Sequence, residues 1–98
     1  MRKMQRAPTT PGEILREEFL KPLKLTQTRL ARHLGCDVKV VNRILNERSG
    51  VTATMALRLA AALGTTPEFW LNAQQAVDLY EAASKARTLP RTIRRTGS

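Results

Sequence analysis

The sequence predicts an all-α protein from two observations. Apolar residues recur at spacings of three and four from Pro11 to about Ser84, and no run alternates as a half-buried strand does. Residues that start helices and glycines that end them also recur at short intervals. These signals predict one domain of five helices over residues 11–84, between basic tails at residues 1–10 and 85–98.

The first helix is predicted to begin after Thr10, which can cap it. Pro11 suits the first turn, and Glu13 stands where a capping box requires an acidic residue. The helix is expected to end near Lys21, because a residue before proline avoids the α region. Its expected buried stripe is Ile14, Leu15, Phe19 and Leu23.

The second and third helices are predicted after the caps Thr26 and Asp37, with a tight turn at Gly35 between them. Ala31 supplies a small side chain where the two helices would cross, and Gly35 allows a positive φ in the turn. This pattern predicts a helix-turn-helix motif over residues 26–46. An ordinary helical hairpin is the alternative. Apolar residues expected to lock the two helices together are Leu30, Leu34, Val41 and Ile44.

The fourth helix is predicted between Thr52 and Gly64, and the fifth after Thr66, with Pro67 in its first turn, as far as about residue 83. The fifth helix is apolar nearly all the way round, so one face is expected to cover the core and another to meet a second subunit. The candidate dimer residues are Phe69, Trp70, Val77 and Tyr80. Alternatively, Phe69 and Trp70 lie entirely within the core of one chain.

The charge balance favours a nucleic-acid partner. Seventeen Lys and Arg against eight Asp and Glu give +9, and the pI is about 11.1. A merely soluble basic surface is the alternative. No Gly-rich phosphate loop or acidic metal cluster is present, so an enzyme is not expected. The longest stretches without a charged residue are nine residues, too short to span a membrane.

The single cysteine, Cys36, and the single histidine, His33, bear on location and metals. One cysteine cannot form an intrachain disulfide, and the pair cannot make a Cys/His zinc site. Neither a metal nor another cofactor is expected. The basic start also lacks the apolar stretch of a signal peptide, so a reducing cytoplasm is the expected location.

Several segments resemble a known family. The run from Leu25 to Gly35 (LTQTRLARHLG) is similar to the Cro/C1 phage-repressor-type, or XRE, helix-turn-helix domain, whose lambda-repressor-like fold has five helices. The segments PGEIL, ILN, MALRLA and GTTPEFWLN resemble the HigA branch of that superfamily, and TPEFWLN is the most specific of them. The likeness covers about residues 11–80.

The resemblance implies an autorepressing antitoxin. Such a protein forms a homodimer, binds a palindromic operator before its own operon, and neutralises a HigB-type toxin that cleaves mRNA. The alternatives are a stand-alone XRE-type regulator without a toxin, or a basic RNA-binding or scaffold protein. The residues alone indicate a sequence-specific binder of double-stranded DNA.

In helix-turn-helix proteins the second helix of the motif enters the major groove and the first crosses the backbone. Carried over by position, the base-reading candidates are Val38, Lys39, Asn42 and Arg43, and the phosphate-binding candidates are Gln27, Thr28 and Arg48. The chain departs from the family at Val38 and Val40, which are apolar where many relatives have polar residues. Tail residues that can also follow phosphates are Arg2, Lys3, Arg6, Arg87, Arg91, Arg94 and Arg95.

Overall fold

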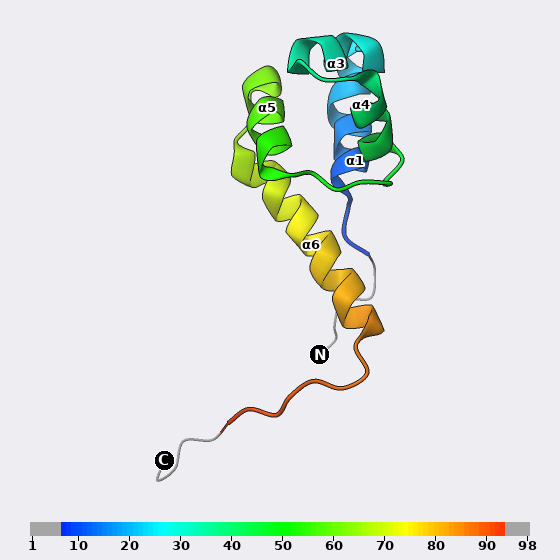
Figure 1. Ribbon diagram of the computed structural model, residues 1–98. Coiled ribbons are helices and arrows are strands. Elements are labelled where there is room, and N and C mark those ends of the chain that lie inside the picture. The colour runs from blue at the N-terminus through cyan, green and yellow to red at the C-terminus, as the bar shows by residue number, and fades with distance from the viewer. Residues whose placement is uncertain (1–6, 94–98) are drawn as a thin grey trace.

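The protein is all-α, as predicted. The computed structural model describes residues 7–93, and within that range it contains five helices and no strand. Three short elements, α1 (Pro11–Ile14), η1 (Leu15–Leu20) and α2 (Lys21–Leu23), follow one another without a break and form the first helix. The others are α3 (Gln27–Leu34), α4 (Val38–Leu45), α5 (Ala53–Leu63) and α6 (Pro67–Lys85). Helix α3 crosses one end of the bundle, and α6 extends beyond the opposite end (Figure 1).

Local capping sets the starts of the helices, which confirms the predicted starts. The side-chain oxygen of Thr10, Thr26, Thr52 or Thr66 accepts the main-chain N–H three residues later, and Asp37 accepts that of Lys39. Each cap satisfies a donor that the helix itself cannot, and is worth about 1 kcal/mol. Helices α3 and α5 end at Gly35 and Gly64, with φ of 75° and 74°.

The first helix differs from the sequence prediction in its middle and at its end. Residues 15–20 form a π-helix, in which the Lys21 N–H bonds to the carbonyl of Arg16, five residues back. In an α-helix, the ring of Pro22 would clash with the main-chain carbonyl four residues before it. The wider π-turn shifts the carbonyls that precede Pro22 and so avoids this clash. The helical backbone therefore continues to Leu23 instead of ending at Lys21.

The π-turn also shifts the buried stripe. Leu15 is fully buried and the next buried residue is Leu20, five positions on, which the sequence analysis did not include. Leu23, expected in the stripe, is 60% exposed. Ile14 and Phe19 are partly buried against the core.

The core lies where the first four helices and the start of α6 meet. Its largest fully buried side chains are Trp70, Leu15, Leu30, Leu59 and Val41. Helix α1 approaches α4 so closely that a Cβ on Gly12 would lie 2.2 Å from the main-chain oxygen of Ile44. This close approach holds the C-terminal end of α4 against the first helix.

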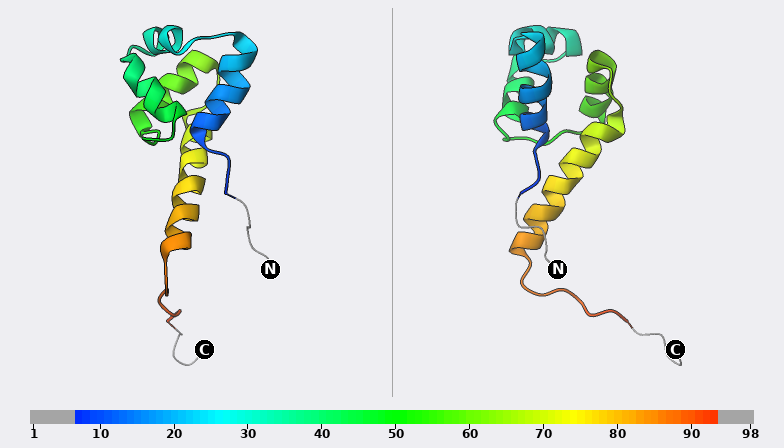
Figure 2. Two further views of the ribbon diagram at one scale, coloured as in Figure 1. Left: turned by 90° about the vertical axis from the view of Figure 1, so that its right-hand side faces the viewer. Right: turned by 180° about the vertical axis from the view of Figure 1, so that it is seen from behind.

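Helix α6 is only partly a core helix. Trp70 is its one buried residue: its side chain is fully enclosed, donates to Thr65 Oγ1 at 2.7 Å, and contacts the rings of Phe19 and Phe69. Trp70 is therefore enclosed by its own chain, which favours for this residue the alternative of a place in the core over one in a dimer interface. Gln74 still accepts a hydrogen bond from the Val51 N–H at 2.9 Å, and only the C-terminal part of α6 projects beyond the other helices (Figure 2), where Leu79 is 63% exposed.

Two findings apply to residues 7–93. No helix in this range has the length and apolar character needed to cross a membrane. No group of three or more His, Cys, Asp or Glu in the same range is placed to hold a metal ion. Of the tail candidates, Arg2, Lys3, Arg6, Arg94 and Arg95 lie outside the described residues, while Arg87 and Arg91 are exposed.

Candidate nucleic-acid interface

The exposed face of α4 carries the four candidate base-reading residues. Val38, Lys39, Asn42 and Arg43 are exposed, whereas Val41, Ile44 and Leu45 are buried. Residues at spacings of one, four and five fall on one side of an α-helix, so the four side chains form one continuous strip. We call this strip the α4 face. Val40, which is apolar where many relatives have a polar residue, is partly buried against the core.

The turn between α3 and α4 meets the steric demands predicted for it. Ala31 is buried where the helices pack, and Gly35 has the left-handed φ of 75° that a side chain would strain. The Cys36 N–H donates to the carbonyl of Ala31 at 3.0 Å, closing the end of α3. Cys36 itself packs against the core as a small apolar side chain.

Two arginines from other helices cap the motif. Arg58 of α5 donates to the carbonyls of Leu34 and Gly35, at 3.3 and 3.1 Å, at the end of α3. Arg16 of the first helix donates to the carbonyl of Leu45 at the end of α4. A cation at a helix C-terminus satisfies free carbonyls and complements the helix dipole. These contacts hold both helices of the motif to the rest of the domain.

Arg16 and Arg58 could not be assigned to the motif from the sequence alone. Each lies more than 20 residues from the carbonyl that it caps. The only local signal is an arginine among apolar neighbours on a helix, as at Arg58 in MALRLA. That signal does not specify a partner.

The phosphate candidates lie beside the α4 face in different ways. Gln27 and Thr28 form the first turn of α3, where Gln27 is half-buried and Thr28 is exposed. Asn42 Nδ2 donates to Gln27 Oε1 at 3.1 Å, so the structure brings a phosphate candidate and a base-reading candidate together. Arg48 is exposed in the connection after α4.

Asn46, the C-cap of α4, is a polar residue outside the predicted base-reading and phosphate-binding sets. Its Nδ2 donates to Asn42 Oδ1 at 3.1 Å and to the Asn42 carbonyl at 3.0 Å. The Asn42 amide is therefore held on both sides by protein groups. Lys39 and Arg43, by contrast, have no side-chain hydrogen bond within the described part of the chain.

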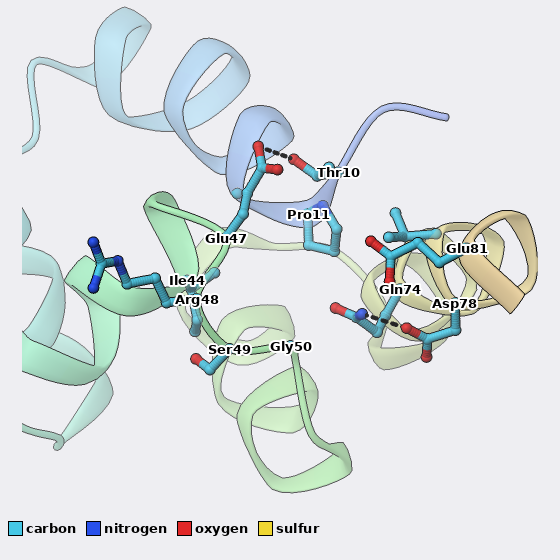
Figure 3. A pocket seen from close by; sticks show the side chains of 12 residues that line it. Thr10, Pro11, Ile44, Glu47, Arg48, Ser49, Gly50, Gln74, Asp78 and Glu81 are labelled. Atoms are coloured by element: carbon cyan, nitrogen blue, oxygen red, sulfur yellow. Dashed lines mark hydrogen bonds between the residues drawn. The ribbon is translucent and has the colours of Figure 1, made fainter. Parts of the chain in front are cut away.

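A hollow of about 250 Å³ lies between the start of α1, the α4–α5 connection and α6. Glu47, Asp78 and Glu81 line it, and the first two accept hydrogen bonds from Thr10 and Gln74 (Figure 3). The Arg48 guanidinium points away from these carboxylates. Because its lining is acidic, this hollow is unsuited to a phosphate backbone.

Comparison with known proteins identifies the family. The family profile described as Helix-turn-helix (HTH_3) matches residues 16–70. Antitoxin HigA-1 of Vibrio cholerae is 48% identical over 86 residues, covering 87% of this chain and 80% of the relative. The chain belongs to the HigA-type antitoxins of the helix-turn-helix family. This confirms the resemblance seen in the sequence.

Solved structures of HigA-type proteins share the fold. Antitoxin GraA, solved in complex with its operator, has a TM-score of 0.73 and 46% identity, covering 93% of this chain and 99% of GraA. The antitoxin HigA of Pseudomonas aeruginosa, solved with the higBA promoter, has a TM-score of 0.76 and 40% identity, with coverages of 79% and 84%. This HigA-type protein is thus a helix-turn-helix DNA-binding regulator.

Proposed function

We propose that this HigA-type protein represses transcription by binding, as a homodimer, a palindromic operator in its own promoter. The exposed α4 face carries the proposal. It is held in place by two capping arginines, and it presents two cations and an amide on one side of a short helix. The two related structures solved with an operator or a promoter support the same role.

The proposed base contacts follow from the chemistry of each side chain. Arg43 and Lys39 can donate to O6 and N7 of guanine, and Val38, 39% exposed, can contact a thymine methyl group. Asn42 offers only the N–H and lone pair that Gln27 and Asn46 leave free. Readout by hydrogen bonds therefore rests mainly on Lys39 and Arg43.

The proposed phosphate contacts flank these residues. Gln27 and Thr28 stand at the start of α3, the helix that crosses the backbone in this geometry. Arg48 extends the basic surface past the end of α4. Such contacts fix the register of the protein on the duplex and carry no sequence information themselves.

Helix α6 supports the dimer. Its projecting part exposes Leu79, and Phe69 is 41% exposed near the start of the helix, while Val77 and Tyr80 are half-buried. Pairing two α6 helices around a two-fold axis would cover these apolar side chains and place two α4 faces on half-sites about 34 Å apart. The dimer residues are thus Phe69, Val77, Leu79 and Tyr80.

The antitoxin role is proposed from sequence similarity to a known antitoxin. The 48% identity to antitoxin HigA-1 supports a toxin partner of HigB type. Co-expression with the product of the adjacent gene tests it. Co-purification and restored growth are expected for an antitoxin, whereas neither would occur with a stand-alone regulator.

Operator binding is tested by fluorescence anisotropy with the palindrome upstream of the coding sequence and with a scrambled duplex. A specific repressor is expected to prefer its operator by about 10³ or more. Equal and strongly salt-dependent affinity for both duplexes would indicate only a basic surface, and would favour the RNA-binding or scaffold alternative.

A further inference from the structure

Three amide side chains form a chain of hydrogen bonds across the helix-turn-helix motif. Asn46 Nδ2 donates to Asn42 Oδ1 at 3.1 Å, and Asn42 Nδ2 donates to Gln27 Oε1 at 3.1 Å. The chain joins the end of α4 to the first residue of α3. We call these three residues the amide relay.

The direction of the relay is fixed by a main-chain carbonyl. The Asn42 carbonyl oxygen can only accept, so the Asn46 atom 3.0 Å from it must be the amino nitrogen. That nitrogen also faces Asn42 Oδ1, which is consequently the acceptor end of the Asn42 amide. The Asn42 amino group is then turned toward Gln27, where it meets Oε1.

The free end of the relay is a donor. With Oε1 of Gln27 engaged by Asn42, the Gln27 amino group has no hydrogen bond to residues 7–93 and offers both of its N–H bonds to another partner. A phosphate oxygen accepts hydrogen bonds and cannot donate them. The opposite orientation of the Gln27 amide would place its oxygen against the phosphate and lose the contact.

From this geometry we infer that Asn46 and Asn42 are positioning residues that hold the Gln27 amide with its N–H groups toward the DNA backbone. Asn46 uses both of its N–H bonds within the protein, so it has no side-chain donor left for a phosphate. Its effect on DNA binding therefore passes through Gln27. The inference rests on the proposed function, in which Gln27 contacts a phosphate.

A double-mutant cycle tests this inference. Asn46→Ala, Gln27→Ala and the double variant are titrated against the operator and the scrambled duplex by fluorescence anisotropy. Asn46→Ala is expected to weaken binding to both duplexes about 2- to 10-fold in the wild-type background, the range of one hydrogen bond. In the Gln27→Ala background it is expected to change affinity by less than about twofold, because the contact that it orients is already absent.

Two outcomes of the double-mutant cycle would contradict the inference. An equal loss from Asn46→Ala in both backgrounds would show that Asn46 acts independently of Gln27. The absence of any loss in the wild-type background would show that the relay does not orient a DNA contact. Either result would overturn the inference.

Controls separate the inference from effects on folding and from the proposed function. Thr54→Ala removes an exposed polar side chain on α5, outside the motif and outside the proposed dimer helix, and is expected to leave affinity unchanged. Thermal unfolding shows whether each variant folds, and Asn46→Ser, whose shorter side chain cannot bridge both Asn42 oxygens, replaces Asn46→Ala if that variant is unfolded. The ratio of wild-type affinities for the operator and the scrambled duplex tests the proposed function separately.

Discussion

The exposed residues of α4 offer different chemistry to a base pair. Arg43 can make two parallel hydrogen bonds with one guanine, Lys39 brings a single ammonium group, and Val38 brings only apolar contact. The loss of each side chain should therefore change sequence preference in its own way. Gln27, outside this face, should affect all sequences alike.

Arg43→Ala should cost about 1 to 3 kcal/mol of binding free energy on the operator and relax specificity at one base pair per half-site. The measurement is an affinity series over operators with single substitutions. Gln27→Ala is the matched comparison, expected to weaken every sequence by a similar factor. A uniform loss from Arg43→Ala would mean that Arg43 contacts the backbone instead of a base.

Gly12→Ala should destabilise the fold by about 3 kcal/mol, because the new Cβ would overlap the Ile44 carbonyl. Gly64→Ala is the comparison: its Cβ meets nothing within 4 Å and strains only a backbone with φ of 74°, costing about 1 to 2 kcal/mol. Urea unfolding measures both. A milder effect at Gly12 than at Gly64 would contradict the close approach of α1 to α4.

Among the elements, local chemistry made the helix starts predictable from sequence. A threonine or aspartate cap acts on a main-chain N–H two or three residues away, so its signal lies within one turn. The π-turn before Pro22 depends on how Leu15 and Leu20 fit the core, which no local pattern records. The enclosure of Trp70 likewise depends on how the helices pack, which no local sequence pattern records.

For the candidate site too, the sequence predicted the features that depend on local pattern and not those that depend on packing. The exposed positions of α4 follow from helical periodicity, which also identifies its buried face. The amide relay and the arginine caps join residues at least 15 positions apart, apart from the Asn42–Asn46 step. Such contacts appear only once the helices are packed.

Arg58→Ala should destabilise the turn between α3 and α4, because the carbonyls of Leu34 and Gly35 lose their charged donor. The expected loss of folding stability is about 1 kcal/mol, at the low end for a charged hydrogen bond because Arg58 is exposed. Arg58→Lys, which keeps the charge, should lose less. Thermal unfolding together with hydrogen exchange of the Gly35 and Cys36 amides checks this. Unchanged exchange in Arg58→Ala would exclude a capping role.

For the whole molecule, the proposed dimer through α6 would link oligomeric state to DNA binding. A single α4 face covers one half-site, and a palindrome offers two. In the proposed dimer, the exposed apolar side chains of α6 are the surface through which two copies would combine their contacts. Dimer loss should therefore weaken operator binding far more than binding to a single half-site.

Leu79→Glu should shift the protein from dimer to monomer, because pairing the helices would bury a carboxylate without a partner. Light scattering after size-exclusion chromatography measures the mass. Leu57→Glu on α5 is the matched control, since Leu57 is 60% exposed and Leu79 is 63% exposed. A dimer that persists in Leu79→Glu, or that is lost equally in Leu57→Glu, would place the interface elsewhere.

Sequence-specific operator recognition by the α4 face is tested most directly by one titration. Wild-type protein and the Lys39→Ala/Arg43→Ala variant are titrated by fluorescence anisotropy against the operator and the scrambled duplex at two salt concentrations. The wild type should prefer the operator by about 10³ or more, and the variant should lose most of that preference while it still binds both duplexes weakly. An operator preference that survives in the variant would show that other residues read the sequence.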